Sequence, residues 1–209
     1  MEENKSIAPR LLVSFVLDNS TSVEPERLQQ MTEQFRGFAA ATAENADLEW
    51  ELITFCDFAP TVLKSFTEKE ITAPAPNGFP LLGRATKVAL ERLNARVEEL
   101  RAAGVTVYRP WIFLLSDGFT MDNMTVSAAR LDGMERSGEV LYLPFKFSPT
   151  LKTERLQALD RNKHMIEIKE GRLDGFFDFV MRMIEQRAAL APDVGIKFAK
   201  TDFEGWAEL

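Results

Sequence analysis

Two acidic side chains stand directly behind two apolar segments of strand length. Asp18 follows the run Leu11–Leu17, and Asp117 follows Trp111–Leu115 with Ser116 between them. Runs that are apolar on both faces are typical of central parallel strands whose sheet is covered by helices on both sides. Because the carboxyl ends of parallel strands meet at one edge, where such sheets bind ligands, we expect the two carboxylates to lie close together.

Hydroxyl groups accompany the first carboxylate at every second position. Ser20 and Ser22 follow Asp18, so one turn offers a carboxylate and two hydroxyl oxygens. Two carboxylates about 4 Å apart repel by about 4 kcal/mol at an effective dielectric constant of about 20, so they need a cation, a proton or greater separation. Hard oxygen ligands of this kind suit Mg²⁺ or Mn²⁺. The residues therefore indicate a cation site formed by Asp18, Ser20, Ser22 and Asp117.

The remaining segments alternate strands with helices, which is typical of an α/β fold. The short connection after Leu48–Phe55 predicts a hairpin, so Thr61–Phe66 should be an antiparallel edge strand. We expect a three-layer α/β sandwich with a mostly parallel central sheet, one antiparallel edge strand and helices on both faces. The other expected strands are Val140–Phe147 and His164–Ile168, and the expected helices are Glu24–Ala43, Pro80–Ala103, Thr125–Ser137, Thr150–Leu159 and Leu173–Ala189.

The length of the chain fits one well-buried domain. Its 209 residues are few for two domains, and we expect one domain at residues 9–189 followed by a tail at 190–209. The tail carries Phe198, Phe203 and Trp206 without clear periodicity. These aromatic side chains favour a tail packed on the domain; a docking peptide for a partner and a frayed end are the alternatives.

Composition excludes several classes of protein. A net charge of -7 argues against a general nucleic-acid binder, which usually has a basic face. No apolar run approaches the roughly 20 residues of a membrane helix. One cysteine, Cys56, and one histidine, His164, leave little room for a multi-cysteine zinc site or histidine-based catalysis. With no basic-then-apolar leader at the start, a cytoplasmic location is expected.

The two acidic motifs resemble those of von Willebrand factor A (vWA) domains. Asp18-x-Ser20-x-Ser22 matches the D-x-S-x-S signature of that family, and Ser116-Asp117-Gly118 is similar to its second acidic motif. The order of elements from Leu11 to Arg187 also matches, so the resemblance covers nearly the whole chain. It implies a Rossmann-like vWA fold with a metal-ion-dependent adhesion site for Mg²⁺ or Mn²⁺, in which an Asp or Glu of a protein partner completes the coordination of the metal.

One ligand position departs from the family pattern. The family usually supplies a threonine from a third loop, within G-T-P-L-G in a bacterial subgroup, where this chain has Gly78-Phe79-Pro80-Leu81-Leu82-Gly83. Phe79 cannot ligate a metal, so the resemblance implies a reduced ligand set in which water takes the place of the hydroxyl. The alternative is a vWA scaffold that has lost its metal, with Asp18 held by serine hydroxyls and backbone amides.

Four residues at the expected rim are candidates for partner contacts: Asn19, Phe79, Phe119 and Asp122. The two phenylalanines, if exposed, would form an aromatic docking surface around the cation. Phe79 folded inward as a plug is the alternative. Asp122 would equally serve as an N-cap of the helix that follows it.

Three functional classes were weighed, and a non-enzymatic protein-interaction module is the expected one. A phosphotransfer enzyme of the haloacid-dehalogenase type would need a second acid where this chain has Ser20. A nucleotide-binding Rossmann domain would need glycines in the turn at residues 18–24, which has none. The Pro-rich stretch before the long helix and the pair Phe176-Phe177 further resemble stand-alone bacterial vWA proteins associated with tellurium resistance, which implies a role in a stress or metal-resistance complex.

Overall fold

A seven-stranded sheet in the order β3-β2-β1-β4-β5-β6-β7 forms the centre of the molecule. The computed structural model describes residues 8–56, 60–68, 70–71, 74–75, 77–147, 165–191 and 194–208. The strands are β1 (Leu11–Asp18), β2 (Leu48–Phe55), β3 (Thr61–Lys64), β4 (Trp111–Ser116), β5 (Leu141–Lys146), β6 (Ile166–Ile168) and β7 (Ala207–Glu208). The helices are α1 (Pro25–Thr42), α2 (Leu82–Ala102), α3 (Thr125–Arg136) and α4 (Leu173–Ala189).

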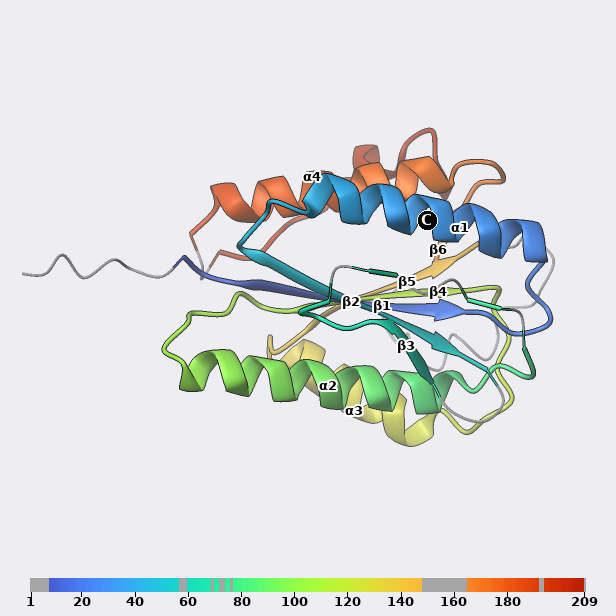
Figure 1. Cartoon of the computed structure of the whole chain (residues 1–209), viewed down its shortest axis with the longest axis horizontal. Coiled ribbons are helices and arrows are strands. Elements are labelled where there is room, and N and C mark those ends of the chain that lie inside the picture. Colours follow the sequence, from blue (N-terminus) through green and yellow to red (C-terminus); the bar gives the residue numbers. More distant parts are fainter. Residues whose placement is uncertain are drawn as a thin grey trace, which may run out of the picture.

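Helices cover both faces of the sheet, as predicted. Figure 1 shows α1 and α4 on one face and α2 and α3 on the other. Strands β2, β1, β4, β5 and β6 are parallel, and β3 pairs antiparallel with β2 as the expected edge strand. The three-layer α/β sandwich is therefore confirmed.

Alternation along β1 divides the core into two parts. Phe15 and its neighbours at every second position face α1 and α4, whereas Leu12 and Val16 face α2 and α3. Every residue of β1 is buried, which is the pattern of a central strand covered on both sides. The apolar run that predicted the strand thus also fixes its place at the centre of the sheet.

The face under α1 and α4 is filled mainly by aromatic rings. Phe15 packs edge-on against Phe35 at 5.2 Å and nearly parallel to Phe113 at 5.4 Å between ring centroids. Phe176 of α4 lies 4.8 Å from Phe145 of β5. Such pairs add about 0.5–1.5 kcal/mol each beyond the burial of their area, so these contacts hold both helices against the strands that end at the carboxyl edge.

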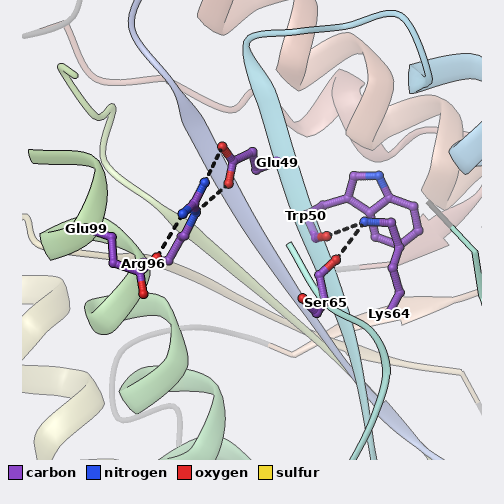
Figure 2. A network of polar contacts seen from close by, with 6 residues as sticks. All are labelled: Glu49, Trp50, Lys64, Ser65, Arg96 and Glu99. Atoms are coloured by element: carbon purple, nitrogen blue, oxygen red, sulfur yellow. Dashed lines mark hydrogen bonds and ion pairs between the residues drawn. The ribbon is translucent and has the colours of Figure 1, made fainter. Parts of the chain in front are cut away.

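Polar contacts fix β2 to its neighbours. Arg96 of α2 donates to both carboxylate oxygens of Glu49, at 2.7 and 3.0 Å, and also to Glu99 (Figure 2). Lys64 of β3 donates to the carbonyl of Trp50 at 2.6 Å and lies 4.1 Å from the centroid of the Trp50 ring. The edge strand and the long helix are therefore tied to the same strand from opposite sides.

The tail adds a strand that the sequence did not predict. After a short 3-10 helix at Lys200–Phe203, β7 pairs antiparallel with β6 at the other edge of the sheet. Phe203 and Trp206 are buried in the core under α4. Trp206 lies so close to Gly175 that a Cβ atom on Gly175 would stand 2.3 Å from the Trp206 Cβ. The glycine therefore permits the contact between α4 and the tail.

Most predicted element bounds agree with the structure within a few residues. Helix α2 begins at Leu82 instead of Pro80, and β3 ends at Lys64 instead of Phe66. The helix predicted at Thr150–Leu159 and the residue His164 lie outside the described residues. None of the helices described is long and apolar enough to cross a membrane.

Candidate metal centre

The two acidic motifs meet at the carboxyl edge of the sheet. Strands β1 and β4 pair in parallel, with Leu17 opposite Leu115, so the residues that follow each strand emerge side by side. Asp18 has an exposed fraction of 0% and Asp117 of 1%. Both carboxylates therefore lie at the carboxyl edge of the sheet, as predicted, and both are buried.

Donors from two loops hold the Asp18 carboxylate. The backbone N–H of Ser20 donates to Oδ1 at 3.0 Å, and the Ser116 hydroxyl donates to Oδ2 at 3.0 Å. The Ser116 oxygen in turn accepts the N–H of Gly118 at 3.2 Å. Gly118 has a φ of 106°, a backbone conformation that glycine adopts readily and residues with a Cβ atom do not. The Ser-Asp-Gly motif therefore bonds to the first carboxylate as well as contributing the second.

The Asp117 carboxylate is only partly satisfied. Its Oδ1 accepts the N–H of Phe119 at 3.0 Å. Its Oδ2 is buried and has no hydrogen-bond partner among the described residues. A buried carboxylate oxygen without a donor is costly, so this atom marks a position where a cation would be stabilised.

The pKa of Asp18 is raised from 3.8 to about 7. Burial is the main cause, because removal from water disfavours the charged form, and the nearby charge of Asp117 adds to it. Hydrogen bonds from Ser20 and Ser116 oppose the rise. Two carboxylates thus share a buried space in which a proton or a metal ion is favoured.

The two predicted serines lie together in the first loop. The hydroxyl oxygens of Ser20 and Ser22 are 2.8 Å apart. Ser20 is buried and Ser22 is exposed, so the pair leads from the carboxylate to the surface. The structure therefore gathers the two serines with Asp18 and Asp117.

The Pro-rich loop before α2 is bound to the first loop. The side chain of Asn19 donates through Nδ2 to the carbonyl of Ala75 at 2.9 Å. The backbone carbonyl of Asn19 accepts the N–H of Asn77 at 3.0 Å. Thr21 donates through its backbone N–H and its hydroxyl to the carbonyl of Gly78, at 3.0 and 3.1 Å. Phe79 follows directly and is 55% exposed. Its side chain thus lies at the rim and does not plug the site.

The other rim candidates have different surroundings. Phe119 is half-buried. Asp122 accepts the backbone N–H groups of Gly83 and Arg84 at 3.0 and 2.9 Å, so it caps α2 instead of the helix that follows it. Asn123 is the side chain that accepts the N–H of Thr125 at the start of α3.

Sequence reasoning overlooked two side chains of the site. The Ser116 hydroxyl donates to the Asp18 carboxylate. The buried Thr120 hydroxyl donates to the Asp122 carboxylate at 2.7 Å, and its oxygen lies 3.2 Å from the carbonyl oxygen of Pro80. The position of Ser116 one residue before Asp117 could have revealed the first contact, whereas no local signal indicates the second. In the part of the chain that the structure describes, no three His, Cys, Asp or Glu side chains converge as a metal-binding group, so a cation between Asp18 and Asp117 would need hydroxyl oxygens and water as its further ligands.

Two solved structures share this architecture at low sequence identity. The crystal structure of manganese-loaded Plasmodium vivax TRAP protein has a TM-score of 0.53 and 12% identity, covering 74% of this chain and 64% of that chain. The SpRpn10 VWA domain has a TM-score of 0.53 and 15% identity, covering 83% of this chain and 95% of that chain. This protein has a vWA fold.

At these identities the likeness concerns the fold alone. The chain spans 64% of the length of the TRAP chain, and the manganese belongs to that protein. No family profile and no curated protein matches the sequence. Within the vWA fold, the function of this chain must therefore be argued from its own residues.

Proposed function

We propose that this vWA protein is a non-enzymatic interaction module that binds an acidic group of a protein partner through a divalent cation, Mg²⁺ or Mn²⁺. The observation that carries the proposal is the buried pair Asp18 and Asp117, in which Asp117 Oδ2 has no hydrogen-bond partner among the described residues. The cation would be held by Asp18, Ser20, Ser22 and Asp117. When bound, it supplies positive charge and an open coordination position for a carboxylate of the partner.

The donor set fits a hard cation. Carboxylate and hydroxyl oxygens are the ligands that Mg²⁺ and Mn²⁺ prefer. Burial, and after it the charge of Asp117, raise the pKa of Asp18, and a cation between the carboxylates would favour the charged form of both. Phe79 in place of the family threonine leaves a reduced ligand set, and a vWA scaffold without metal is the competing outcome.

The rim residues would contact the partner. Phe79 is exposed beside the first loop, and large aromatic side chains are frequent in the energetic centre of protein interfaces. Asn19 keeps a buried Oδ1 without a hydrogen-bond partner among the described residues. Phe79 is therefore the partner contact of this proposal, whereas Asn19, which is 5% exposed and bonded to the Ala75 carbonyl, would hold the rim in shape together with Phe119 and Asp122.

The second candidate, phosphotransfer by Asp18 in the manner of haloacid dehalogenases, has less support. That chemistry needs a general acid two residues after the nucleophile, and Ser20 stands there with its hydroxyl against Ser22. The resemblance to bacterial tellurium-resistance proteins supports a cytoplasmic role in a stress or metal-resistance complex, as part of the same proposal.

Calorimetric titration of Mg²⁺ and of Mn²⁺ tests the metal. We expect binding by the wild type, no binding by Asp117→Asn, and wild-type binding by Asp178→Asn, an exposed carboxylate of α4 with the same change of charge. Absence of binding to the wild type would establish the metal-free scaffold instead.

Affinity capture with and without EDTA tests the partner separately. A protein retained by the wild type in Mg²⁺, and lost with EDTA or in Asp117→Asn, is the expected result. Equal recovery under all conditions would mean that the carboxyl edge is not the docking site. Hydrolysis of p-nitrophenyl phosphate that depends on Asp18 would instead support the second candidate function, phosphotransfer by Asp18.

A further inference from the structure

A second cavity lies at the opposite end of the sheet from the metal site. It has a volume of about 490 Å³. Its walls are formed by the amino ends of β4 and β5, the last turn of α2 and the tail. In Figure 1 the strand β1 points to the right, so this cavity belongs to the left end of the molecule. Nothing in the proposed function involves this end.

Three arginines line this cavity: Arg101, Arg109 and Arg187. Arg101 lies exposed in the last turn of α2. Arg109 donates to the carbonyls of Glu135, at 3.0 Å, and Val140. These contacts fix the guanidinium of Arg109, whereas that of Arg101 lies in solvent at the mouth of the cavity.

Arg187 is the buried member of this group. It is 5% exposed, donates to the carbonyls of Ala191 and Val194, and stacks on the Tyr108 ring at 4.6 Å. Its Nε is buried and has no acceptor among the described residues. A buried charge whose donors are only partly satisfied is costly, and because Arg187 is one of the residues that line the cavity, an anion bound there would offset this cost.

The charge of the lining is strongly positive for an acidic protein. Among the described residues that line the cavity, Glu139 is the one carboxylate, and its Oε1 already accepts the Ser137 hydroxyl at 2.6 Å. The chain as a whole carries a net charge of -7. Arg101 and Arg187 also offset the negative ends of their helices, but that role does not use the Nε of Arg187 or require Arg109.

We propose that this cavity binds a small molecule through an anionic group, a phosphate or a carboxylate, held by Arg101, Arg109 and Arg187. Guanidinium groups match the planar and bidentate geometry of these anions. The volume falls within the usual range of small-molecule sites, about 300–1,000 Å³. Val107, Pro110 and Ile196 on the same wall give the remainder of such a molecule an apolar surface.

Titration calorimetry with inorganic phosphate and with succinate, at constant ionic strength and in metal-free buffer, tests this site. EDTA is used to remove the metal and is then dialysed away because its own carboxylates would compete, so binding here is independent of the carboxyl edge. We expect at least one of the two anions to bind the wild type, and the stronger ligand identifies phosphate or carboxylate as the preferred group.

Matched variants locate the binding. Arg101→Gln and Arg109→Gln should each weaken it by about tenfold, the loss of one charge-assisted hydrogen bond. Arg36→Gln removes an exposed charge on α1 and should bind as the wild type does. Failure of both anions to bind, or equal weakening in all three variants, would overturn the proposal, and thermal unfolding of each variant confirms that it is folded.

Discussion

The Asp122 carboxylate caps helix α2 by accepting the N–H of Gly83, which lies 39 residues earlier in the chain, at 3.0 Å. The same carboxylate accepts the Thr120 hydroxyl at 2.7 Å. Because the Thr120 oxygen also accepts the N–H of Leu82 at 3.2 Å and lies 3.2 Å from the carbonyl oxygen of Pro80, the loop after β4 holds the loop before α2. The two loops at the rim of the candidate metal site therefore form one connected unit.

Removing this cap should destabilise the protein. Loss of a side-chain cap costs about 0.5–2 kcal/mol, and we expect Asp122→Ala to fall in the upper half of that range because it leaves two N–H groups and Thr120 without their acceptor. Asn123→Ala, which removes only the bond to Thr125, is the matched control. Thermal unfolding measures both, and an equal effect of the two changes would argue against a bond that links the loops.

The central part of the fold could be predicted from the sequence because its signals are local. The run Leu11–Leu17, apolar apart from Ser14, is typical of a strand covered on both faces, so the residues after it were expected at the carboxyl edge. The same reasoning brought Asp117 beside Asp18, since β1 and β4 pair in parallel.

The contacts that the sequence did not reveal join segments far apart in the chain. Asp122 and Asn123 were both candidates for capping the helix that follows them; Asn123 does accept the N–H of Thr125 at its start, whereas Asp122 reaches back to α2. Strand β7 is two residues long and has no periodicity to detect. Its pairing depends on Trp206 fitting against Gly175, a tertiary contact without local signal.

The stability of the metal-free protein should depend on the protonation of Asp18. Its pKa is about 7 in the folded state against 3.8 as the ordinary value, so the folded state holds a proton that the unfolded state has released between these pH values. Stability contributed by this group is therefore present below pH 4 and is lost as the pH rises towards 7. In EDTA, Asp18→Asn should melt at a higher temperature than the wild type at pH 8, and the difference should shrink at pH 5.

Asp178→Asn serves as the control for this pH dependence, because that carboxylate is exposed. Mg²⁺ should raise the melting temperature of the wild type at pH 8 and leave Asp18→Asn unchanged. A wild type more stable than Asp18→Asn at pH 8 in EDTA would show that the buried, charged form of Asp18 does not cost the folded state stability.

Restoring the family threonine should strengthen metal binding. Phe79 lies directly after Gly78, whose carbonyl accepts two hydrogen bonds from Thr21 in the first loop. Phe79→Thr places a hydroxyl there, and we expect Mg²⁺ to bind several-fold more tightly in calorimetry. Phe79→Val has the shape of threonine without its oxygen, so it separates ligation from the removal of the ring. Equal affinities of the threonine and valine variants would mean that the position does not reach the metal.

Two helical glycines should respond to alanine in opposite ways. In α4, a Cβ at Gly175 would stand 2.3 Å from the Cβ of Trp206 and 2.5 Å from its Cγ, so Gly175→Ala must displace the tail from the core. Overpacking of this kind costs about 1–3 kcal/mol. In α1, a Cβ at Gly37 would meet nothing within 4 Å, and the lower backbone entropy of alanine should stabilise the helix by about 0.5–1 kcal/mol.

Chemical denaturation of both variants measures the difference. In Gly175→Ala the tryptophan fluorescence should shift to the red as Trp206 becomes exposed to water, while the buried Trp50 and Trp111 give a constant background. That shift should be absent in Gly37→Ala, because α1 does not contact the tail through this residue. If Gly175→Ala instead unfolded like the wild type with unchanged fluorescence, Trp206 would have to occupy a different position from the one that closes the sheet at β7. The opposite signs of the two substitutions therefore test the packing of the tail against α4 apart from the general preference of helices for alanine.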